Sequence, residues 1–77
     1  MDFLEQVADG LAQEVLKVVD ATGDEDVITR IKKEVGTSST TLEEAFMTAI
    51  RVRRAEKRGR ALLKEIAKSA ATNAPIT

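Results

Sequence analysis

Hydrophobic residues recur along the chain at helical spacing, and glycine or hydroxyl-rich stretches separate three such patterns. In the first, over residues 3–21, apolar positions recur at steps of three and four, which indicates a helix with one core-facing side. These positions are Leu4, Val7, Ala8, Leu11, Ala12, Val15, Val18 and Val19. Asp2, with Glu5 three residues later, resembles a capping box and predicts a helix start near Phe3.

A second, shorter helix is predicted over residues 25–35. Gly23 is expected to end the first helix as a left-handed cap, and the acids of residues 24–26 then lie where the helix dipole favours negative charge. Gly36 is the expected stop. The predicted buried positions are Val27, Ile28, Ile31 and Val35.

The third pattern predicts a long helix over residues 42–71, about 45 Å at 1.5 Å per residue, against about 27 Å for the first. Either Thr40 with Glu43 or Thr41 with Glu44 forms a capping box at its start. The chain as a whole is therefore expected to be all-α. We predict one domain over residues 1–72, a helical hairpin plus one long C-terminal helix, followed by a frayed tail of residues 73–77.

The apolar side of the long helix changes direction along its length. On a helical wheel, the apolar residues of the first half, Leu42 to Ala49, centre about 95° away from those of the second half. The drift expected from supercoiling accounts for only part of this angle. The two halves are therefore expected to meet different neighbours, the second half meeting another copy of the chain. The predicted self-association residues are Val52, Ala55, Gly59, Leu62, Leu63 and Ile66. The alternative is a kink at Gly59 that folds the last part back into a four-helix monomer.

Composition limits what this chain can do. It has 77 residues, of which 43% are hydrophobic, and it contains neither cysteine nor histidine. The core is therefore small, and disulfides, zinc–sulfur sites and the usual groups for proton transfer near neutral pH are excluded. Glu43 and Glu44 point about 100° apart and are not a catalytic pair. We expect no enzymatic activity, no catalytic residues, no cofactor and no metal.

Acidic residues between Asp20 and Asp26 follow part of the spacing of a calcium-binding loop. The match fails at two decisive places, because Glu25 stands where glycine is required and Ile31 where a bidentate glutamate belongs. Calcium binding is therefore not expected. Residues 1–6 are acidic where a secretory signal is basic, and the sequence contains no membrane-length apolar run. These features favour a cytoplasmic protein without a membrane partner.

Net charge is −1, but the charges are segregated. Residues 1–26 carry a strong acidic excess, and residues 27–77 carry a basic excess. The densest basic run, here named the basic ridge, is Arg51, Arg53, Arg54, Lys57, Arg58 and Arg60. It is interpreted as a polar face that pairs with the acidic first helix, as a nucleic-acid contact, or as a surface for an acidic protein or an anionic membrane.

Together these patterns predict a small non-enzymatic protein–protein interaction module, an adaptor or regulator. It is expected to form a homodimer through the second half of the long helix and to bind another protein. The alternative is a nucleic-acid-binding regulator that uses the basic ridge, although a pI of about 5.4 and the absence of Tyr and Trp disfavour it.

Overall fold

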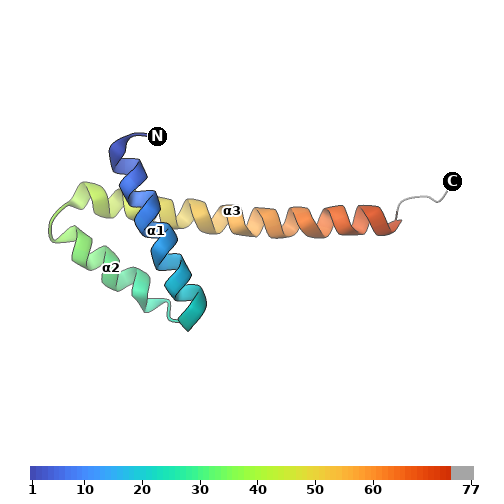
Figure 1. The fold of residues 1–77 in the computed structure, drawn as a ribbon, viewed down its shortest axis with the longest axis horizontal. Helices are drawn as coiled ribbons and strands as arrows, with labels where there is room; N and C mark the ends of the chain where they lie inside the picture. The colour runs from blue at the N-terminus through green and yellow to red at the C-terminus, as the bar shows by residue number, and fades with distance from the viewer. Residues whose placement is uncertain (74–77) are drawn as a thin grey trace.

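The computed structural model describes residues 1–73, which form three α-helices (Figure 1). They are α1 (Phe3–Thr22), α2 (Asp26–Gly36) and α3 (Thr40–Asn73). The first two helices form a hairpin that packs on the first part of α3. The predicted all-α class, three helices and long C-terminal helix are therefore confirmed.

Both predicted ends of α1 are confirmed by the hydrogen bonds there. The backbone N–H of Glu5 donates to Asp2 Oδ1 at 2.8 Å, which satisfies one of the free donors at the helix start. At the other end Gly23 has a φ of 74° and donates its N–H to the carbonyl oxygen of Val19 at 2.7 Å. Only glycine adopts this left-handed conformation without strain, so Gly23 sets where the chain turns toward α2.

The start of α2 depends on Asp24 rather than on the residue directly before the helix. Asp24 Oδ1 accepts the backbone N–H of Asp26 at 3.0 Å, whereas Glu25 makes no side-chain capping bond. Gly36 was the expected stop, but it is the last helical residue and has no left-handed φ. The Glu43 carboxylate lies over Gly36, so a Cβ at this position would require that side chain to move.

The start of α3 corrects both predicted capping boxes. Its first turn is capped by Ser39, whose hydroxyl oxygen accepts the N–H of Leu42 at 3.0 Å, so the helix begins two residues earlier than expected. α3 then runs without interruption past Gly59, and the folded-back alternative is wrong. The helix includes Asn73, the first residue of the predicted tail; residues 74–77 of that tail lie outside the described residues.

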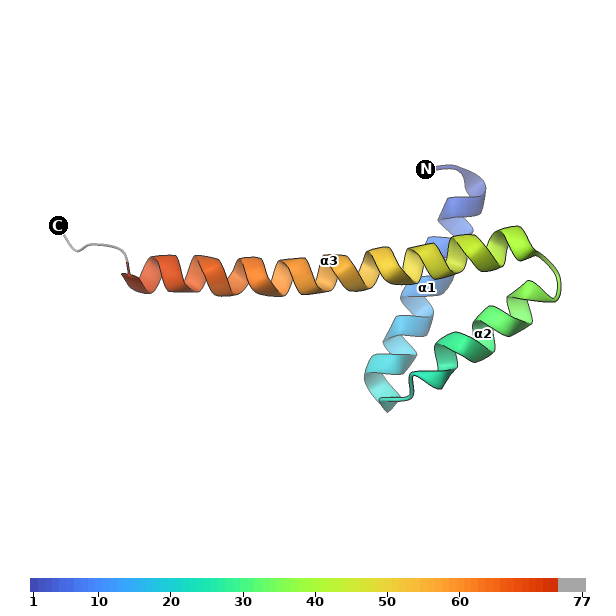
Figure 2. The ribbon, with the colours of Figure 1, turned by 180° about the vertical axis from the view of Figure 1, so that it is seen from behind.

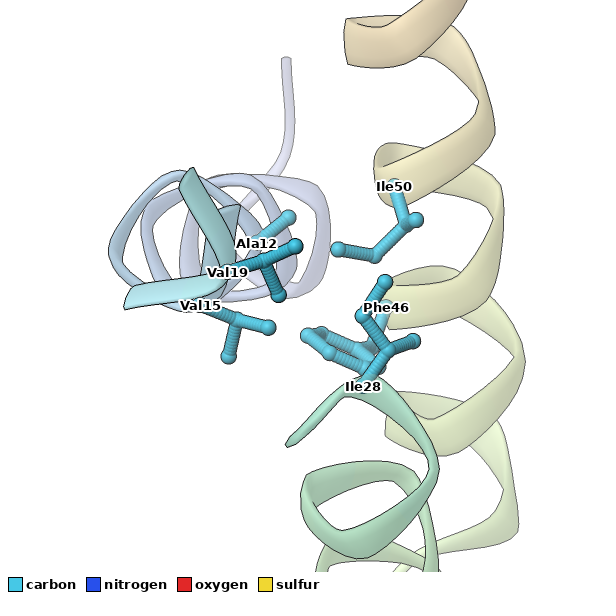
Figure 3. Packing of buried hydrophobic residues seen from close by; sticks show 6 residues of the cluster. All are labelled: Ala12, Val15, Val19, Ile28, Phe46 and Ile50. Atoms are coloured by element: carbon cyan, nitrogen blue, oxygen red, sulfur yellow. The ribbon is translucent and has the colours of Figure 1, made fainter. Parts of the chain in front are cut away.

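A small core lies where the three helices meet. Phe46 is the largest fully buried side chain, and it projects between α1 and α2 (Figure 3). The buried cluster is Ala12, Val15, Val19, Ile28, Phe46 and Ile50. Val7 and Val18, placed in the core by their spacing, are exposed. Both lie about 90° or more around α1 from the centre of its buried strip, which is formed by Ala8, Ala12, Val15 and Val19. Figure 1 shows that α1 crosses α3 at a steep angle.

The molecule is much longer than a compact chain of its size. Its radius of gyration is 17.1 Å, compared with about 11–12 Å for a compact domain of this length, and its longest dimension is 62 Å. Figure 2 shows the cause, which is that the hairpin covers only one end of α3 and the rest projects alone. No helix within residues 1–73 is long and apolar enough to span a membrane.

Replacement of Phe46 by alanine tests the core. Phe46→Ala is expected to lower the free energy of unfolding by about 3–5 kcal/mol, because it removes the largest buried side chain and leaves a cavity. Phe3, the only other phenylalanine, is 80% exposed and supplies the matched control. Phe3→Ala is expected to change stability by less than about 0.5 kcal/mol. Urea unfolding followed by circular dichroism measures both, and equal losses would contradict this packing.

Candidate functional site

The projecting part of α3 is the most unusual surface of the molecule. From Ala55 to Thr72, a segment here named the overhang, every residue is exposed. Residues with high helix propensity dominate this segment, and an ion pair from Glu56 to Arg60 at 3.0 Å adds local support at the favourable i,i+4 spacing. The overhang buries no residue against the hairpin, and its helix depends mainly on its own sequence.

The predicted self-association residues lie together on one side of α3. Here named the apolar stripe, they are Val52, Ala55, Gly59, Leu62, Leu63 and Ile66. Val52 is 60% exposed, Leu62 and Ile66 are each 56% exposed, and Leu63 is 64% exposed. No heavy atom lies near the position of a Cβ on Gly59. The structure thus leaves the stripe uncovered by residues 1–73.

The apolar stripe faces away from the hairpin. Phe46 and Ile50 set the core-facing direction of α3, and on a helical wheel this direction lies about 165° from the centre of the stripe. The sequence pattern indicated a smaller difference, because it omitted Ile50 and gave equal weight to Leu42, Ala45 and Ala49, which are only partly buried. With the core direction taken from the buried residues, the stripe cannot reach the hairpin unless α3 breaks.

The basic ridge lies partly on the core side of α3, where it meets the acidic hairpin. Three of its members pair with acids far away in the sequence, from the middle of α1 to the turn before α2. The pairs are Arg53 with Asp9, Arg54 with Glu25, and Lys57 with Asp20. The interpretation of the ridge as a face that pairs with the acidic first helix is thus supported by specific contacts.

The closest-fitting of these contacts joins Arg53 to Asp9. The guanidinium donates from Nε to Oδ1 at 2.7 Å and from Nη2 to Oδ2 at 2.6 Å, a two-point arrangement that fixes orientation as well as distance. The guanidinium lowers the pKa of Asp9 below its ordinary value, and the carboxylate raises that of Arg53. This pair ties the middle of α1 to α3 beside the core.

The two other contacts fasten the far end of the hairpin. Arg54 donates to Glu25, just before α2, and this hydrogen bond lowers the pKa of the Glu25 carboxyl. Lys57 Nζ lies 3.3 Å from Asp20 Oδ2, near the end of α1. Both lysine and aspartate are well exposed, so this third pair contributes little by itself.

The remaining ridge residues have no long-range partner within the described chain. Arg60 pairs only with Glu56 of its own helix, and Arg51 and Arg58 form no ion pair with residues 1–73. A phosphate backbone would therefore find two uncommitted guanidinium groups, while contact with the three ridge residues that pair with the hairpin requires those pairs to open.

The described residues do not bring together a metal site. Among residues 1–73 no group of three acidic side chains lies close enough to hold a metal ion. The sequence pattern did not indicate a shallow groove between the first turns of α1 and the first half of α3. Its lining includes Leu4, Thr48, Ala49 and Val52, so it adjoins one end of the apolar stripe. The position of Thr48 on the same side of α3 as the apolar stripe could have indicated this groove.

Acidification tests the long-range ion pairs. The pKa values of Asp9 and Glu25 are lowered on folding, so these pairs stabilise the fold above the unfolded values, about 3.9 and 4.3, and lose that contribution as pH falls through the lower folded values. We expect the urea midpoint to fall between about pH 5 and pH 2.5. The double variant Asp9→Asn, Glu25→Gln is expected to be less stable at pH 7 and to show a flatter pH profile.

A matched control separates these pairs from general charge. Glu14 is exposed on α1 and makes no ion pair with the described residues. Glu14→Gln removes one acidic charge from α1, as Asp9→Asn does, and it is expected to leave both the midpoint at pH 7 and the profile nearly unchanged. If Glu14→Gln flattened the profile as much as the double variant, overall charge rather than pairing would explain the acid sensitivity.

Comparison of the chain with protein-family models, with curated proteins and with solved structures found no match in any of the three. What the protein does is therefore inferred from the burial, charge and spacing of its own residues. Two surfaces are candidates for binding a partner, the uncovered apolar stripe and the partly paired basic ridge.

Proposed function

We propose that this protein is a small non-enzymatic interaction module that self-associates through the second half of α3 and acts as an adaptor or regulator of another protein. The observation that carries this proposal is the uncovered apolar stripe, with Leu62, Leu63 and Ile66 all more than half exposed on the overhang, beyond the part of α3 that the hairpin covers. Contiguous exposed apolar residues of this kind are typical of interaction surfaces.

The energetic case is strongest for a symmetric partner. Burial of a leucine or isoleucine side chain stabilises by about 1.5–3 kcal/mol, and a twofold dimer gains that from both copies of the stripe at once. The small residues Ala55 and Gly59 add little apolar area, but they let a second helix approach closely. A second copy also supplies, without any further assumption, a surface of the same length and shape.

Catalysis finds less support in the structure than binding does. The chain has no histidine or cysteine, and the best-positioned carboxylates within residues 1–73, Asp9 and Glu25, are engaged by arginines. An ion-paired carboxylate with a lowered pKa is a poor general base near neutral pH. These residues hold the hairpin on α3, and we assign them that structural role.

Nucleic-acid binding by the basic ridge is the second candidate, and the ion pairs to the acidic hairpin weigh against it. Asp9, Asp20 and Glu25 place negative charge directly beside the ridge, and a phosphate backbone would be repelled by it. We expect fluorescence anisotropy to detect no binding to labelled duplex DNA or to RNA at 50 mM salt. Salt-dependent binding that Arg54→Gln and Arg58→Gln weaken would favour the alternative instead.

Charged substitutions on the stripe test self-association. The wild-type chain is expected to have twice the mass of 8.4 kDa in light scattering after size-exclusion chromatography at micromolar concentration. Leu62→Asp and Ile66→Asp are each expected to shift it to monomer, because a carboxylate would be buried without a partner at the interface. A wild-type monomer even at high micromolar concentration would overturn the proposal.

The matched control is Ala61→Asp, on the opposite side of the same helical turn. Ala61 is exposed and is not part of the apolar stripe. The substitution Ala61→Asp introduces the same charge as Leu62→Asp at the neighbouring position, and it is expected to leave the dimer intact. Circular dichroism of all three variants checks that the hairpin remains folded. Loss of the dimer in Ala61→Asp as well would indicate a general effect of charge on the overhang.

A further inference from the structure

We infer that the second copy lies antiparallel along the apolar stripe, with the large side chains of one overhang against the small residues of the other and the two hairpins at opposite ends. This inference rests on the self-association proposed above. It adds an orientation and a register, and the two follow from residue size and charge along the exposed side of α3.

The exposed side of α3 has the spacing of a two-helix seam. Its residues alternate steps of three and four, which keeps one narrow side of a helix against a partner helix. The seam consists of Val52, Ala55, Gly59, Leu62, Ile66 and Ser69, all exposed in the single chain. Leu63 lies beside the seam and widens its apolar part.

Side-chain size along the seam is uneven, and this unevenness selects the orientation. After Val52 come the small residues Ala55 and Gly59, and the large residues Leu62 and Ile66 follow before Ser69. An antiparallel pair reverses the order, so that Leu62 meets Gly59 of the second copy and Ile66 meets its Ala55. A parallel pair would place Gly59 against Gly59 and leave an unfilled space, which costs packing energy.

Charge beside the seam favours the same register. Arg58 and Glu65 lie on one edge of the seam, two turns apart, and neither forms an ion pair within residues 1–73. In the antiparallel register Arg58 faces Glu65 of the second copy, and twofold symmetry creates this pair twice. In the parallel register Arg58 would instead face Leu63 and Glu65 would face Ala70.

The hairpin leaves room for the end of the second copy. In the antiparallel register the last turns of one overhang lie against Thr48 and Val52 of the other. There the shallow groove between α1 and α3 continues the apolar side, with Leu4 and Ala49 in its lining. The seam is therefore uncovered along its whole length, including the part that lies beside the hairpin.

Single cysteines test the register without background, because the chain has none of its own. Val52→Cys and Ser69→Cys are prepared separately, mixed, allowed to exchange and treated with a short bismaleimide. In the antiparallel register Val52 of one copy meets Ser69 of the other. Like positions lie roughly 25 Å apart, so the mixture is expected to give about tenfold more crosslinked dimer than either variant alone.

The outcomes separate this inference from the proposed function. Crosslinking of each variant with itself, without enrichment in the mixture, would retain self-association and overturn the antiparallel register. A dimer by mass that does not crosslink in the mixture would overturn the register as well. A wild-type monomer by mass would overturn both proposals, and no crosslinking of any kind is expected in that case.

Charge exchange provides a second measurement. Arg58→Glu and Glu65→Arg each place like charges opposite one another, and each is expected to raise the dimer dissociation constant about tenfold. An equimolar mixture of the two variants restores opposite charges and is expected to return to the wild-type value. Lys64→Glu, on the far side of the helix, is the control and is expected to retain wild-type affinity. Failure of the mixture to recover would overturn the pairing of Arg58 with Glu65.

Discussion

The angle at which α1 crosses α3 determines most of what is unusual about this molecule. α1 crosses α3 at a steep angle (Figure 1) and buries one narrow strip from Ala8 to Val19, so it contributes only alanines and valines to the core. Phe46 fills the space that these small residues leave between α1 and α2. The hairpin consequently covers one end of α3, and a helix of 34 residues extends far beyond its support.

Electrostatics and packing act together at that crossing. The core is small and consists of alanine, valine and isoleucine side chains around one phenylalanine. The two-point contact of Arg53 with Asp9 orients the middle of α1 on α3. The ion pair of Arg54 with Glu25 ties the turn before α2 to the same helix. The segregation of charge between the two halves of the chain thus places acids of the hairpin against bases of α3 at three points.

How far the sequence predicts this structure depends on how local each signal is. Asp2 and Gly23 mark the ends of α1 correctly, because a cap involves only neighbouring residues. The start of α3 was missed because several consecutive hydroxyls could cap it, and the choice of Ser39 depends on the turn before it. Val18 was misplaced, and Ile50 was omitted from the core, because periodicity does not give the crossing angle. Without the crossing angle, the sequence could not show which acid pairs with each arginine. The apolar stripe could be predicted, because it depends only on spacing within α3.

Continuity of α3 through Gly59 has a consequence for scale. A helix without a bend has a constant rise, so its length in residues translates directly into a distance. In the proposed dimer the two hairpins would be held about 45 Å apart, on a rod with no hinge. The two hairpins of such a dimer could bind two partner sites at once only where the distance between those sites matches the distance between the hairpins. Insertion or removal of one heptad in the overhang would alter that span by about 10 Å and would leave each hairpin as it is.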